Sequence, residues 1–92
     1  MNTDRFVELA KMLVIGYVKA EFNKEITKDD AFIVWQCKLL KNNKALVTTN
    51  LRDGMYYEIT YNGEAEECYL DAYAKERNLC FSENDVLKIL NR

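Results

Sequence analysis

The sequence predicts an α+β fold in which an N-terminal helix packs on a four-stranded antiparallel meander, with a short C-terminal helix. The dipeptides Asp53-Gly54 and Asn62-Gly63 flank a stretch rich in tyrosine and β-branched residues. Such dipeptides tolerate the positive φ angles of tight turns and are strong hairpin signals. Helical spacing of apolar residues over 4–22 and a capping signature near the C-terminus predict the two helices.

The N-terminal helix is expected over residues 4–22. Thr3 is a suitable N-cap, and Asp4 favours the positive end of the helix dipole. Between Met12 and Val18 the helix is apolar almost all round, whereas a helix on a small sheet needs only one apolar stripe. We therefore expect a second layer over its outer side, either the C-terminal segment or a second subunit.

The first hairpin is expected to use residues 31–41 as a strand and Asn42-Asn43 as a two-residue turn. This register pairs Leu39 with Leu46 and Cys37 with Thr48. One face then carries a set of apolar side chains, namely Ile33, Trp35, Cys37, Leu39 and Leu46.

The second hairpin is expected to turn at Asn62-Gly63, which pairs Tyr57 with Cys68 and Glu58 with Glu67. Its inner face gathers Met55, Tyr57, Ile59, Tyr61, Cys68, Leu70 and Ala72. Its outer face gathers Tyr56, Glu58, Thr60, Glu67, Tyr69, Asp71 and Tyr73. Residues 65–77 are also good helix formers, but the tight turn favours a strand over 66–74.

The final helix is indicated by Ser82, which is followed by acidic residues and an apolar run from Val86 to Leu90. With 92 residues, the chain is expected to form a single domain, 1–92.

The formal net charge of −2 hides a division between the two parts of the chain. Residues 1–52 carry nine Lys or Arg against six Asp or Glu, and residues 53–92 carry four against nine. This balance is not that of a strongly basic nucleic-acid-binding protein, so we do not expect a nucleic acid partner.

The three cysteines, Cys37, Cys68 and Cys80, are odd in number and widely spaced. Without a signal peptide or a long apolar run, the sequence predicts a cytoplasmic protein with reduced, buried thiols and no membrane insertion.

The absence of histidine removes the commonest general base and the commonest metal ligand. The cysteines lack zinc-site spacing, and no glycine-rich phosphate loop is present. Glu58 and Glu67 face each other in the predicted register, but an exposed pair relieved by Lys75 or Arg77 accounts for them. We therefore expect no catalytic residue, metal site or cofactor, and no enzyme.

The outer face of the second hairpin is the best candidate for a binding surface. Tyrosine combines a large apolar area with a polar tip and is enriched in protein contacts. Surrounding carboxylates would select a basic partner. The predicted contact residues are Tyr56, Glu58, Glu67, Tyr69, Asp71 and Tyr73, although some of these tyrosines would also fit beneath the final helix.

A homodimeric structural or regulatory module is the alternative. Its interface would be helix 4–22, through Val7, Val14 and Val18. Its weak nucleic-acid contact would use the lysines of the first hairpin: Lys38, Lys41 and Lys44.

Several blocks of the sequence resemble a small uncharacterised family encoded by phages and prophages of Gram-positive bacteria. They are residues 34–38 (Val-Trp-Gln-Cys-Lys), 44–46 (Lys-Ala-Leu), 53–63 and 69–73 (Tyr-Leu-Asp-Ala-Tyr). The resemblance implies a phage or prophage accessory protein inside a bacterial host. Small phage proteins without enzymatic motifs frequently bind and block a host protein, which by analogy makes an inhibitor of a defence or nucleic-acid-handling complex the leading hypothesis.

Overall fold

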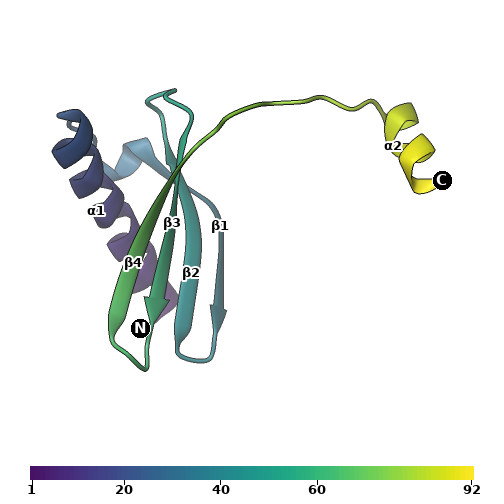
Figure 1. The fold of residues 1–92 in the computed structure, drawn as a ribbon. Coiled ribbons are helices and arrows are strands. Elements are labelled where there is room, and N and C mark those ends of the chain that lie inside the picture. Colours follow the sequence, from purple (N-terminus) through teal and green to yellow (C-terminus); the bar gives the residue numbers. More distant parts are fainter.

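The computed structural model describes residues 1–92 and has the predicted α+β architecture (Figure 1). The sheet has four antiparallel strands in the order β1-β2-β3-β4. The elements in chain order are α1 (Thr3–Phe22), the single-turn helix η1 (Lys28–Asp30), β1 (Ala31–Leu39), β2 (Asn42–Thr49), β3 (Met55–Asn62), β4 (Glu67–Ala74) and α2 (Glu83–Leu90).

Both ends of α1 are capped by asparagine. The side-chain oxygen of Asn2 accepts a hydrogen bond from the backbone N–H of Arg5 at 2.9 Å, so the cap lies one residue before the predicted Thr3. At the other end, Asn23 adopts a left-handed conformation and its N–H donates to the carbonyl of Lys19 at 3.1 Å. Asparagine suits both positions because it tolerates positive φ and its amide reaches backbone groups.

A single stripe of α1 packs on one face of the sheet. Residues Phe6, Ala10, Val14 and Val18 follow at intervals of four and are at most 1% exposed. Spacing of this kind places side chains on one side of a helix. They form the core with Ile26, Ala31, Ala45, Val47, Tyr57 and Ile59.

The outer side of α1 is not covered by another part of the chain. Met12 is 49% exposed and Gly16 is also exposed. The C-terminal segment does not pack there, since no residue of α2 is buried. Of the two covers expected for this side, the C-terminal segment is therefore wrong, and a second subunit stays a prediction.

The first hairpin turns two residues earlier than predicted. Leu40 and Lys41 form the turn, with Leu40 at φ 56°, and Asn42 already begins β2. Consequently Leu39 faces Asn42, and Cys37 faces Lys44.

A bulge in β1 between Ile33 and Trp35 also changes which residues share a face. Ile33 pairs with the fully buried Val47 and lies on the α1 side. Trp35 pairs with Leu46, on the opposite side. The prediction that Ile33, Trp35 and Leu46 share one face is wrong for Ile33, because an inserted residue reverses the alternation.

The second hairpin has a longer loop than predicted, and residues 63–66 connect β3 to β4. Glu66, rather than Gly63, adopts the left-handed conformation with φ 54°. The side-chain oxygen of Asn62 accepts hydrogen bonds from the backbone N–H groups of Glu64 and Ala65 at 3.1 and 3.2 Å, which shapes the loop.

This loop moves the register by four residues. Tyr57 faces Ala72 instead of Cys68, and Glu58 faces Asp71 instead of Glu67. An even shift leaves every side chain on its predicted face, because side chains alternate with a period of two. The strand expected for 66–74 is confirmed as β4, and Tyr57 and Ile59 are fully buried beneath α1.

The turns of the two hairpins lie against each other. The backbone N–H of Gly63 donates to the side-chain oxygen of Asn42 at 3.2 Å. A Cβ atom added to Gly63 would lie 2.7 Å from the Cβ of Lys41 and closer still to its carbonyl oxygen. Gly63 is therefore required for the close approach of two chain segments and not for its φ angle.

We predict that Gly63→Ala destabilises the fold by about 1–3 kcal/mol, the usual cost of overpacking. The matched control is Gly16→Ala, since Gly16 lies in α1 with nothing within 4 Å of an added Cβ. That change should stabilise the helix by about 0.5–1 kcal/mol. Denaturant unfolding measures both, and equal effects of the two substitutions would contradict the proposed contact.

The hydroxyl of Tyr57 is buried without a hydrogen-bond partner. Its ring packs edge-on against Tyr17 at 5.4 Å between centroids. Burial, with further contributions from Asp53 and Tyr17, raises the pKa of Tyr57 to about 12. The folded state thus binds this proton more tightly than the unfolded chain does, so stability is retained below pH 10 and lost as the pH rises toward 12.

We predict that Tyr57→Phe is neutral or slightly stabilising at pH 7, since it removes an unpartnered hydroxyl. The variant should also lose less stability than the parent between pH 10 and 12. Thermal unfolding followed across this range measures both effects. Equal alkaline losses in the two proteins would show that Tyr57 does not control this behaviour.

Candidate functional site

The face of the sheet opposite α1 has no layer packed over it. We call it the open face. Its members follow from the strand register, in which paired residues point to the same side. Tyr56 pairs with Thr48 and Tyr73, and Thr48 pairs with Phe32, so this row crosses all four strands on one side.

The half of the open face on β3 and β4 carries all six predicted contact residues. We call it the acidic tyrosine half, and it consists of Tyr56, Glu58, Glu67, Tyr69, Asp71 and Tyr73. Tyr69 and Tyr73 are 50% and 52% exposed, and Tyr56 is half-buried beside Tyr73. The structure thus brings the predicted set together on one side, and no tyrosine of it packs under α2.

The charge of this half is only partly neutralised. Lys44 Nζ lies 3.5 Å from Glu58 Oε1, which relieves the like-charge pair of Glu58 with Asp71. Asp71 forms no ion pair within the chain, and neither does Glu67. The carboxylate of Glu67 accepts a hydrogen bond from the hydroxyl of Tyr69 and thereby raises the pKa of that tyrosine. The acidic tyrosine half therefore keeps a negative charge.

The other half of the open face is apolar along β1 and at Leu46 of β2, whereas the remaining β2 residues on this face, Asn42, Lys44 and Thr48, are polar. We call its apolar part the apolar half, consisting of Phe32, Trp35, Cys37, Leu39 and Leu46. Phe32 is 48% exposed, Trp35 is 42% exposed and Leu39 is 71% exposed. Sequence reasoning grouped four of these residues on one face but added Ile33 and left out Phe32, because strict alternation gives no sign of the bulge. The unbroken run of large side chains from Phe32 to Trp35 is the signal that alternation fails there.

The three lysines of the first hairpin do not form one patch. Lys38 pairs with Asn43 and lies on the α1 side of the sheet, whereas Lys44 lies on the open face beside Glu58. Lys41 is in the turn between them. Strand alternation therefore separates the residues that adjacency in sequence had grouped.

The dimer interface predicted for α1 is also not available. Val14 and Val18 are fully buried against the sheet, and only Val7 is partly exposed. A second copy cannot contact the two buried valines without opening the core, so the prediction is wrong for Val14 and Val18.

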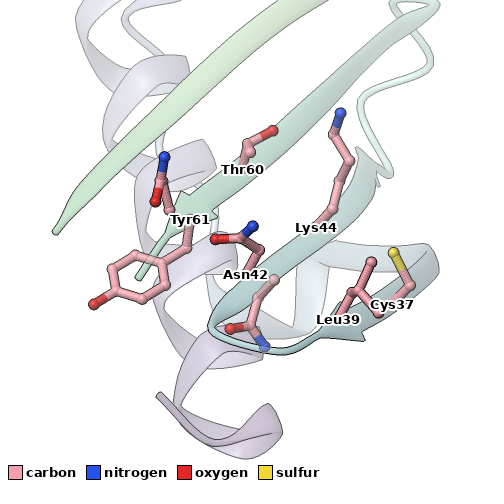
Figure 2. A pocket seen from close by; sticks show the side chains of 8 residues that line it. Cys37, Leu39, Asn42, Lys44, Thr60 and Tyr61 are labelled. Atoms are coloured by element: carbon pink, nitrogen blue, oxygen red, sulfur yellow. The ribbon is translucent and has the colours of Figure 1, made fainter. Parts of the chain in front are cut away.

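A shallow hollow of about 170 Å³ lies at the hairpin end of the sheet. Figure 2 shows that the side chains of Lys44, Tyr61 and Cys37 diverge around it. Its volume is below the roughly 300–1,000 Å³ typical of small-molecule sites, and convergent polar groups are a further mark of such sites. The hollow is therefore not a candidate active site.

The cysteines are all free and exposed, so the expectation of buried thiols is wrong. Cys68 is exposed overall, but partial loss of water around its thiol raises its pKa. No group of three or more His, Cys, Asp or Glu side chains is placed to hold a metal ion. Neither helix combines the length and the apolar character needed to cross a membrane.

Residues 7–83 match the model of a family of unknown function (DUF6275). The matched region extends from the second turn of α1 to the start of α2 and so includes the whole sheet. No curated protein and no solved structure matches the chain. The match covers most of the sequence, and the chain belongs to this family of unknown function, DUF6275.

Proposed function

We propose that this protein is a non-enzymatic binding module that attaches its acidic tyrosine half to a basic surface of another protein. The observation that carries the proposal is the gathering of three tyrosines and three carboxylates on one uncovered sheet face. Two of those carboxylates, Glu67 and Asp71, have no cationic partner in the chain.

The chemistry of this half suits protein recognition. Tyr69 and Tyr73 are half-exposed, and a tyrosine held in a strand loses little entropy when it is covered by a partner. Carboxylates between the rings steer a positively charged partner and repel a negative one. The rigid sheet holds these groups in fixed relative positions, which reduces the cost of binding.

The partner class follows from the charge and from the resemblance described above. In a phage or prophage setting, the partner is a host protein with a basic surface. The nucleic-acid groove of a defence or DNA-handling complex presents such a surface. Occupation of that groove would inhibit the complex by excluding its nucleic acid.

We predict that Glu67→Lys combined with Asp71→Lys weakens partner binding by about tenfold or more, because two favourable charge contacts become repulsive. The tagged parent and variant are used to capture proteins from host lysate, and the partner retained by the parent is then purified and titrated. Binding by the parent should weaken as salt rises.

The matched control is Glu21→Lys with Asp29→Lys, which gives the same change in net charge at exposed sites in α1 and η1. It should bind like the parent. If both double variants bind equally well, or if the captured partner is acidic, the proposed surface is wrong.

The alternative, a homodimeric module that contacts nucleic acid through Lys38, Lys41 and Lys44, is less well supported because these lysines point in different directions. Titration of labelled duplex DNA with the parent tests it directly. Binding that is lost on changing all three lysines to alanine would favour this alternative over the acidic-surface proposal.

A further inference from the structure

The C-terminal helix α2 stands apart from the rest of the molecule. Figure 1 shows the chain leaving β4 as an extended arm, residues 75–82, that carries α2 clear of the sheet. No residue of α2 is buried. Its apolar side chains are 42–72% exposed, namely Val86, Leu87, Ile89 and Leu90.

The sequence nevertheless specifies this helix. Ser82 caps it, with its side-chain oxygen accepting from Asp85 N at 3.2 Å, and the Asp85 carboxylate accepts from Ser82 N in return. A capping box of this kind fixes the start of a helix. A helix of eight residues is marginal alone in water and is stabilised mainly by packing of its apolar side. The apolar side of α2 therefore requires a surface to cover it.

The arm is also unpaired. The backbone N–H of Lys75 donates to the carbonyl of Gly54 at 2.7 Å and holds the start of the arm against the sheet. Beyond this point, residues 76–81 form no backbone hydrogen bond. Leu79 and Phe81 are 65% and 59% exposed.

The apolar half of the open face is the matching surface. Its side chains on β1 are exposed, and every copy of the chain carries it. The area agrees with what a stable dimer needs. Half-exposed apolar side chains contribute on the order of 80 Å² each, so the six on one arm offer roughly 500 Å². Two reciprocal arms, with the faces that receive them, bury about 2,000 Å², which is the size of a stable interface.

We propose that the occupant is a second copy of this chain: each copy lays its arm and α2 on the apolar half of the other. The arm is extended and projects away from its own sheet, so α2 does not lie on the open face of its own chain. Since each copy offers one helix and one apolar half, mutual exchange closes at a two-fold dimer. The acidic tyrosine halves stay uncovered in this dimer. The dimer proposal rests on observations separate from those that carry the proposed function.

Light scattering during gel filtration of the full chain, over a concentration series, tests the exchange. The parent should show twice the 10.8 kDa mass of one chain. Leu87→Glu with Leu90→Glu should halve that mass while the monomeric domain stays folded, because α2 does not pack on its own sheet. The matched control, Asn84→Glu with Asn91→Glu, adds the same charge on the polar side of α2 and should remain dimeric.

The receiving surface is tested by Trp35→Glu and, in case that variant is unstable, by Leu39→Glu at a more exposed position. Each should be monomeric. An equimolar mixture of the α2 variant with a face variant should regain part of the dimer, because one intact helix and one intact face then meet. Docking of α2 on its own sheet predicts no such recovery.

A monomeric parent would overturn the proposal, whether or not α2 is protected from hydrogen exchange. A dimer that survives both the α2 and the face substitutions would overturn it as well. These measurements use no other protein, so their outcome is independent of the basic partner.

Discussion

The packing of one helix stripe on one face of the sheet is the constraint on which the other features depend. A four-stranded sheet has two faces, and α1 covers only one of them with Phe6, Ala10, Val14 and Val18. A layered domain buries each apolar face against another element. In this chain the only remaining helix is α2, which does not pack on the sheet. The open face therefore exists because the fold has one helix packed on the sheet and the sheet has two faces.

Whether the sequence predicts which residues share a face depends on whether the error in strand register is an even or an odd number of residues. The loop between β3 and β4 is longer than the dipeptide at Asn62-Gly63 suggests, because Asn62 organises a wider turn and Gly63 serves the contact with Lys41. The error in register is even, so the division of β3 and β4 into inner and outer residues is predicted correctly.

The same reasoning fails in β1 because a bulge adds one residue there. An odd insertion places Ile33 and Trp35 on opposite sides, so alternation alone wrongly adds Ile33 to the apolar half and omits Phe32. Similarly, two of the valines predicted for a dimer interface on α1, Val14 and Val18, serve the core. Periodicity predicts which residues share a face, but it does not predict which face another element covers.

The two halves of the open face differ in chemistry, and this difference constrains their roles. A surface rich in Trp, Phe and Leu loses water most favourably against another apolar surface, such as that of α2. A surface that combines tyrosine with unpaired carboxylates is better suited to a solvated partner of opposite charge, because burying Asp71 without a cation would be costly. A single apolar helix can thus cover the apolar half favourably, but it cannot cover the acidic tyrosine half without burying unpaired carboxylates. That mismatch is why we propose self-association for one half of the sheet and partner binding for the other.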